Sequence, residues 1–229
     1  MQGLRTVSTS GSPPPVRPGS LGVLGGTFDP IHLGHLVIAE QVRVALGLER
    51  VLFVPAGTPP HKPGRPISRA GDRLAMVELA IADHPAFEAS RLEVDRPGPS
   101  YSVDTLASLA EAARAAGREP DLTFILSAEA FEEIETWHEP SRILQLATIA
   151  VVPRGAARPP SRSWVGERFP GLEDRVVLVD APRIELSASG IRDRVRRGWS
   201  IRYLVPPPVE AYIADHRLYR TASLEEEPS

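Results

Sequence analysis

The sequence contains no cysteine, and this absence excludes a disulfide framework, a thiol nucleophile and a thiolate metal site. It also has no run of about 18 consecutive apolar residues, so it predicts no membrane span. Neither sign of charge is in large excess, because 26 Lys and Arg face 29 Asp and Glu, a formal net charge of −3. Such a chain offers no broad basic surface for nucleic acid, so any affinity for phosphate must come from a local arrangement. Lysine is nearly absent, since Lys62 is the only one.

The rest of the composition is that of one ordinary globular domain. The chain has 229 residues, of which 42% are hydrophobic, and can bury a core of its own. Residues 1–20 are rich in Ser, Pro and Gly, so we expect a disordered N-terminal tail. Residues 220–229 include three successive glutamates and are expected to form a flexible C-terminal tail. The expected domain therefore covers 21–219.

Short apolar runs alternate with helical patterns along this domain. The runs that predict strands are 21–24, 51–54, 87–94, 122–126, 148–152 and 176–179. The patterns that predict helices include 34–46, 68–83, 102–116 and 187–197. Several strand runs are apolar throughout, as in a parallel sheet covered by helices on both faces. The expected fold is therefore α/β: a Rossmann-like, doubly wound, mostly parallel sheet with a C-terminal helical portion. Ligands of such sheets bind where strands run into helices.

The first strand-to-helix turn has the features of an anion site. Gly25 and Gly26 let the backbone approach a ligand closely, and Asp29-Pro30 fixes the turn. His32 and His35 are three residues apart, so both imidazoles lie on one face of the following helix at its N-terminus. This turn lacks the G-x-G-x-x-G pattern of dinucleotide-binding oxidoreductases. A metal site on the two histidines lacks an evident third ligand, so we expect no protein metal site.

Two further segments carry phosphate-binding chemistry. Ser187 and Ser189 are candidate caps of a helix whose first turn also holds Arg192, so its N-terminus is a second anion site. Lys62 follows His61 in a proline-stiffened loop after the second expected strand. In a chain whose other cations are arginines, a compact ammonium at this place indicates a point contact with phosphate, although a solubilising surface lysine is the plainer interpretation.

The run GGTFDPIHLGH over 25–35 resembles the signature of the nucleotidylyltransferase superfamily, most closely its nicotinate-nucleotide adenylyltransferase branch. The segment LSASGIR over 186–192 resembles the ISSTxIR motif of that family, and PPHK over 59–62 resembles its active-site loop. The resemblance implies that His32, His35, Lys62 and Arg192 carry the catalysis, with Mg²⁺ accompanying ATP. The ATP-binding residues that it implies are Gly25, Gly26, Thr27, Phe28, His32, His35, Glu129, Ser187, Ser189, Ile191 and Arg192.

Two other stretches resemble the acceptor side of this family. Residues 100–106 resemble SYTxDTL, and 127–137 resemble a stretch written GADxxxxxxxW, whose tryptophan adjoins a pyridine ring. The implied acceptor-binding residues are Thr27, His61, Lys62, Tyr101, Thr105 and Trp137. Tyr101 and Thr105 could equally serve packing or capping. Ser189 replaces Thr in the helix motif, and three further positions depart from the family pattern: Ser127 replaces Gly, Glu129 replaces Asp, and Ala188 replaces Ser.

The resemblance implies an adenylyltransferase that joins ATP and nicotinate mononucleotide to give deamido-NAD and pyrophosphate in NAD biosynthesis. One alternative is the same chemistry on nicotinamide mononucleotide, phosphopantetheine or FMN. Another is a catalytically degenerate nucleotide-binding protein, which the three departures keep open. The expected partners are these small molecules, without nucleic acid or membrane. A cytoplasmic location is expected, and the sequence is compatible with a homo-oligomer.

Overall fold

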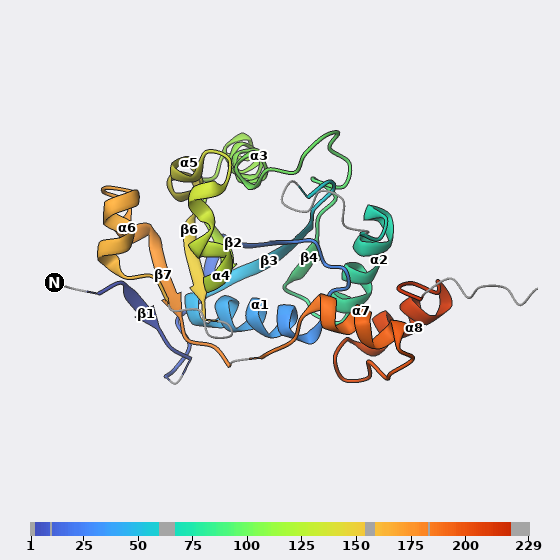
Figure 1. The fold of residues 1–229 in the computed structure, drawn as a ribbon. Helices are drawn as coiled ribbons and strands as arrows, with labels where there is room; N and C mark the ends of the chain where they lie inside the picture. The colour runs from blue at the N-terminus through green and yellow to red at the C-terminus, as the bar shows by residue number, and fades with distance from the viewer. Residues whose placement is uncertain (1–2, 10, 60–66, 154–158, 183, 221–229) are drawn as a thin grey trace, which may run out of the picture.

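The computed structural model describes residues 3–9, 11–59, 67–153, 159–182 and 184–220. Their strands form one parallel sheet of seven in the order β1-β7-β6-β5-β2-β3-β4 (Figure 1). The strands are β1 Arg5–Val7, β2 Arg17–Gly26, β3 Leu48–Pro55, β4 Phe87–Ala89, β5 Leu122–Ser127, β6 Thr148–Val152 and β7 Val176–Val179. The expected doubly wound α/β fold is confirmed.

Helices cover both faces of this sheet. The α-helices are α1 Leu33–Leu46, α2 Ala70–Ile81, α3 Ser102–Ala115, α4 Ala128–Glu132, α5 Pro140–Leu146, α6 Arg162–Arg168, α7 Ala188–Arg196 and α8 Pro207–Asp215, with 3-10 turns at Ile134–Thr136 and Glu173–Arg175. In Figure 1, α1 and α7 lie on one face, and α3, α4 and α5 lie on the other. The chain's end after β7 is helical, as expected.

Each face of the sheet has its own buried core, because successive strand residues point to opposite sides. Leu24 of β2 and Ile125 of β5 pack with α1, α2, α7 and α8. Their neighbours Val23 and Phe124 pack with α3, α4, α5 and α6. This double burial explains why the strand runs are apolar at almost every position.

The carboxyl ends of β2 and β5 mark the place where the strand order reverses. From β2 the chain moves outward to β3 and β4, and it then returns to β5 on the other side before reaching β6 and β7. Ligand sites of open α/β sheets lie in the crevice at such a reversal. The glycine-rich turn that follows β2 therefore lies where the sequence predicts chemistry.

Two expectations about sheet edges are corrected. Residues 1–20 are not a tail throughout, because β1 pairs with β7 at one edge and β2 begins at Arg17. Composition misses β1 because backbone hydrogen bonds along an edge, and not apolar burial, hold this largely exposed strand. At the other edge, the strand expected over 87–94 ends at Ala89, where its pairing with β3 ends. At the C-terminal end, Arg220 is described, and 221–229 lie outside the described residues.

Candidate active site

A cavity of about 420 Å³ opens where β2 and β5 end, a size typical of small-molecule sites. Two groups of residues are distinguished around it, and not all of their members line it. The phosphate side comprises the 25–29 turn, His32, His35 and the N-terminus of α7, and the ring side comprises Tyr101, Trp137 and His138. The predicted site residues that line this cavity are Gly25, Gly26, Thr27, His35, Tyr101 and Trp137. The structure therefore joins motifs that are about 110 residues apart in the sequence.

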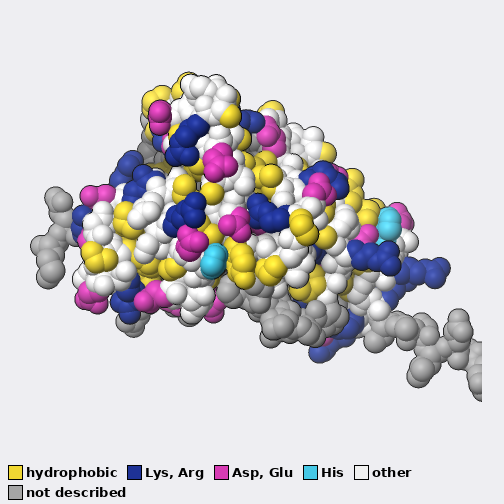
Figure 2. Space-filling model, turned by 90° about the horizontal axis from the view of Figure 1, so that it is seen from above, with side chains coloured by type: hydrophobic (Ala, Val, Ile, Leu, Met, Phe, Trp, Pro, Cys, Tyr) yellow, Lys and Arg dark blue, Asp and Glu magenta, His cyan; other side chains and the backbone are white. Residues whose placement is uncertain are grey.

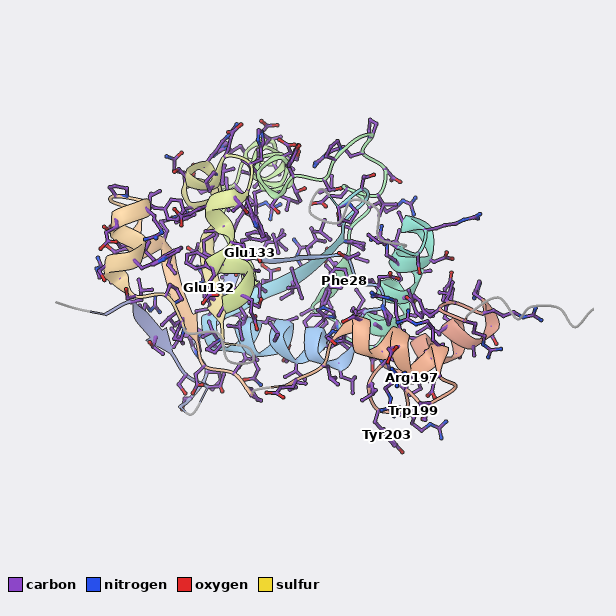
Figure 3. The ribbon with its side chains drawn as sticks, viewed as in Figure 1. Phe28, Glu132, Glu133, Arg197, Trp199 and Tyr203 are labelled. Carbon is purple, nitrogen blue, oxygen red and sulfur yellow. The ribbon has the colours of Figure 1, made fainter. Side chains whose placement is uncertain are left out.

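The β2–α1 turn brings backbone to the cavity wall. A side chain at Gly26 would be crowded, since a Cβ there would lie 3.1 Å from the Phe28 ring, which would have to shift. Phe28 has a positive φ of 49° and is 2% exposed. Its ring lies in the interior, where it packs edge-on against His35 with ring centres 5.0 Å apart (Figure 3). The Phe28 side chain therefore supports the turn from the protein interior and does not line the cavity.

The two histidines of the motif hold each other at the start of α1. His32 is the N-cap residue, and its backbone N–H donates to Nδ1 of His35 over 3.2 Å. The rings stack with centres 3.7 Å apart. Because Nδ1 of His35 accepts this bond, a neutral His35 ring carries its proton on Nε2. His35 lines the cavity, whereas His32 is buried behind it, so the arrangement suits His35 as the donor and His32 as its support.

Asp29 is the point where distant segments meet on the phosphate side. Its side chain is 4% exposed, and Oδ1 accepts a 2.7 Å hydrogen bond from the Tyr219 hydroxyl. The backbone N–H of Ser68 donates to Oδ2 over 3.4 Å. Arg192 of α7 donates from Nη1 to the backbone oxygen of Asp29 over 2.6 Å. The motif's aspartate therefore organises the turn from inside the protein.

Arg73 of α2 is a buried cation that the motifs did not predict. It is 1% exposed, and its guanidinium donates to the backbone oxygens of Thr27, Gly57 and Ser68 over 2.8, 3.0 and 3.0 Å. Burial lowers the pKa of Arg73, and the charge of Asp29 acts against this shift. Arg73 thereby fixes the carbonyls of the glycine-rich turn and of the loop after β3.

The N-terminus of α7 is built as predicted but stands outside the cavity lining. Ser187 is the N-cap residue and accepts from the backbone N–H of Gly190 over 3.1 Å, and Ser189 donates to the Ser187 hydroxyl over 3.3 Å. Arg192 reaches back to the β2–α1 turn. The side chain of Ile191 is buried in the core and its backbone N–H donates to the backbone oxygen of Ser187, so its contact with ATP stays a prediction.

The ring side presents aromatic faces to the cavity. Tyr101, at the start of α3, lies against His138 with ring centres 4.6 Å apart. Trp137 meets Phe124 of β5 edge-on at 6.1 Å. A flat ring bound in the cavity would find both indole and phenol surfaces within reach.

Thr105 and Glu93 form a buried pair beneath the ring side. The Thr105 hydroxyl donates to Oε1 of Glu93 over 2.7 Å and accepts from Arg96 over 3.2 Å. Thr105 is 2% exposed and does not line the main cavity, and its hydroxyl is engaged inside the protein, so its contact with the acceptor stays a prediction. Glu93 does line the cavity, and burial raises its pKa against the opposing effects of Thr105 and Arg96.

Three other predicted residues are Glu129, His61 and Lys62. Glu129 is exposed in the first turn of α4 and is not part of the lining, whereas Ser127, the N-cap of α4, is. His61 and Lys62 lie outside the described residues. No group of three or more His, Cys, Asp or Glu side chains gathers as a metal site among the residues that the structure describes. Within the same ranges, no helix is long and apolar enough to cross a membrane.

The fold and this site define the class of protein. A cytidylyltransferase-like family model matches residues 23–194, which include the β2–α1 turn, the cavity and the start of α7. The solved Plasmodium falciparum nicotinic acid mononucleotide adenylyltransferase, complexed with NaAD, shares this fold with a TM-score of 0.71 at 17% identity, over 87% of this chain and 97% of that one.

Relatives with higher identity narrow the class. A probable nicotinate-nucleotide adenylyltransferase of Thermomicrobium roseum is 48% identical over 201 residues, which cover 88% of this chain and 92% of the relative. One from a Roseiflexus species is 50% identical over 201 residues, 87% of this chain and 98% of the relative. The chain belongs to the nicotinate-nucleotide adenylyltransferase family.

Proposed function

We propose that this chain transfers the adenylyl group of ATP to nicotinate mononucleotide, giving deamido-NAD and pyrophosphate in NAD biosynthesis. The observation that carries the proposal is that His35 and Trp137 line the same cavity. Such a cavity can hold a phosphoryl group and a flat heteroaromatic ring at the same time. The identity to relatives named for this activity supports it.

The proposed reaction is a direct in-line displacement. A phosphate oxygen of the mononucleotide forms a bond to the α-phosphorus of ATP, and the bond from that phosphorus to the bridging oxygen of the β-phosphate breaks. Both the attacking and the leaving group are ionised phosphates, so no side chain has to accept a proton. Catalysis then consists of alignment and charge stabilisation.

The residues divide this task between them. His35 donates from Nε2 to the α-phosphoryl oxygens, and His32 holds the His35 ring in place through the helix start. Lys62, Arg192 and the N-terminus of α7 offset the charge of the leaving pyrophosphate, with Ser187 and Ser189 as hydroxyl donors. Glu129 accepts a hydrogen bond from a hydroxyl of the adenylate ribose. Trp137 and Tyr101 stack on the acceptor ring, and His61 contacts the acceptor from the loop after β3.

Mg²⁺ accompanies ATP in this proposal. The buried Asp29 carboxylate is engaged by Tyr219 and Ser68, so the donors that fit the ion are phosphate oxygens of the nucleotide and water. The ion supplies charge neutralisation on those phosphates.

On the face shown in Figure 2, basic and acidic side chains are interspersed, which supports small-molecule partners over nucleic acid. Cytoplasmic action and a homo-oligomeric state are further proposals, tested by cell fractionation and light scattering.

A pyrophosphate-release assay with ATP and a panel of acceptors tests the proposal. The panel contains nicotinate mononucleotide, nicotinamide mononucleotide, phosphopantetheine and FMN. We expect the highest kcat/KM with nicotinate mononucleotide. A preference for another member would reassign the acceptor. ATP binding by calorimetry without turnover on any acceptor would instead identify a catalytically degenerate nucleotide-binding protein.

A further inference from the structure

The segment after α8 returns to the β2–α1 turn, 190 residues away in the sequence. There the Tyr219 hydroxyl donates to Oδ1 of Asp29 over 2.7 Å, and the same oxygen of Tyr219 lies 4.0 Å from the sulfur of Met76. Burial and the adjoining Asp29 charge raise the pKa of Tyr219, so the phenol keeps its proton and acts as a donor. This contact joins the C-terminal part of the chain directly to the predicted catalytic motif.

Asp29 also connects the two helix ends of the phosphate side. Its backbone oxygen accepts from Nη1 of Arg192 in α7, and Pro30 and Ile31 are all that separate it from His32 at the N-cap of α1. A shift of the Asp29 carboxylate would therefore move the docking point of Arg192 and the start of α1 together. Arg73 holds the backbone of Thr27, two residues before Asp29, but none of its hydrogen bonds within the described residues reaches the Asp29 side chain.

We infer that Tyr219 is a positioning residue for adenylyl transfer: its hydrogen bond to Asp29 sets the relative placement of His35 and Arg192 around the ATP phosphates. The inference rests on the proposed function. It assigns the C-terminal segment a role in the phosphate side of the site, although Tyr219 does not line the cavity. The ring side shares no hydrogen bond with Asp29 or Tyr219 among the described residues, so the effect is confined to ATP and to turnover.

The chain offers a matched control for this hydrogen bond. Tyr212 of α8 donates to Oδ1 of Asp72 in α2 over 2.9 Å, so it also ties the C-terminal part to α2. Among the described residues, the side chains of Tyr212 and Asp72 hydrogen-bond to each other, and neither makes a hydrogen bond to the β2–α1 turn. Y219F and Y212F each remove one phenol-to-carboxylate bond and keep the ring. A purely structural role of both bonds would make the two variants behave alike.

The experiment measures steady-state kinetics of both variants below their melting temperatures, with ATP and nicotinate mononucleotide varied in turn. For Y219F we expect kcat/KM for ATP to fall about 10-fold to 100-fold, from the loss of a hydrogen bond to a buried carboxylate. Its KM for the mononucleotide should stay within about twofold of wild type, and Y212F should match wild type in both. Equal kinetics of Y219F and Y212F would overturn the inference, as would an equal rise of both KM values in Y219F.

Two further measurements keep the result decisive. D29N removes the carboxylate from the same bond, so D29N combined with Y219F should lose less than the product of the two single losses. Multiplicative losses would show that the two residues act separately and would contradict the inference.

If wild type proves inactive on every acceptor, the proposed function fails, and the ATP affinity of Y219F, compared with that of Y212F by calorimetry, still tests the positioning role. Should Y219F not fold, D29N compared with Y212F carries the same test.

Discussion

The two sides of the cavity are built in different ways. On the phosphate side, polar groups are held by hydrogen bonds from distant segments, such as Arg192 to Asp29 over 163 residues of sequence. On the ring side, the aromatic side chains meet in two pairs, in which Tyr101 packs against His138 and Trp137 packs against Phe124. Phosphoryl transfer depends on fixed geometry, whereas stacking tolerates small displacements. The difference indicates that the phosphate side determines the rate and the ring side selects the acceptor.

The sharpest test of this division is His35→Ala. Loss of the donor to the α-phosphoryl group should lower kcat about 100-fold to 1,000-fold, as for other preorganised transition-state donors. The change also removes the acceptor for the His32 backbone N–H, so H35N, whose side-chain oxygen can replace Nδ1, separates the helix start from catalysis. Steady-state kinetics should show both variants to be slow. His216→Ala, at an exposed histidine stacked on Tyr212, is the control, and near-normal turnover of H35A would refute the assigned role.

Trp137→Ala should act on the opposite side and with a smaller effect. Stacking of a ring on an aromatic side chain is worth about 1–3 kcal/mol, so the KM for the acceptor should rise roughly 10-fold to 100-fold. The KM for ATP should change little. Trp199, which is 57% exposed and stands at the outer edge of the molecule in Figure 3, gives the matched control W199A. A fall in kcat with both KM values unchanged would break the proposed division.

The sequence predicted the phosphate side better than the ring side, for a physical reason. Glycines, a fixed turn and two histidines are compact local features, and they fall together in one short segment between β2 and α1. Residues of the ring side reach the cavity only through packing of α3, α4 and β5, so short-range patterns cannot separate a lining residue from a buried one. Thr105 illustrates this, because its hydroxyl turns inward to Glu93.

Long-range contacts account for what the sequence did not reveal. Tyr219 and Asp29 meet through the whole tertiary fold, and no spacing rule pairs them. Arg73 did carry a signal, since it shares helical spacing with the buried residues Val77 and Ala80. An arginine on an apolar helix face indicates a buried cation with fixed partners. Strand β1 left no such signal, because its pairing uses backbone groups only.

Ser187→Ala tests the second helix end of the phosphate side at a smaller scale. The Ser187 hydroxyl caps α7, so its loss should lower the free energy of unfolding by about 1 kcal/mol. Ser161→Ala removes an equivalent cap from α6, where the Ser161 hydroxyl accepts from the backbone N–H of Trp164 over 3.1 Å. Thermal unfolding should show similar losses for both. Only S187A should also raise the KM for ATP, by a few-fold; an equal KM in the two variants would remove α7 from the phosphate side.

The smallest expected effect concerns Glu93, and it appears as a trend with pH. Burial raises the pKa of Glu93 above its ordinary value of 4.5, so ionising this carboxyl costs more in the folded than in the unfolded chain. Its contribution to stability is fully present below pH 4.5 and is lost as the pH rises through the raised pKa. Glu93→Gln keeps an oxygen for the Thr105 hydroxyl but does not ionise. Chemical denaturation over a pH series should therefore show E93Q gaining stability relative to wild type as the pH rises from about 4.5 toward neutrality. If the stability difference between E93Q and wild type stayed constant with pH, Glu93 would ionise without cost. The surroundings of Glu93 beneath the ring side would then stabilise charge as well as the hydrogen-bonded phosphate side does.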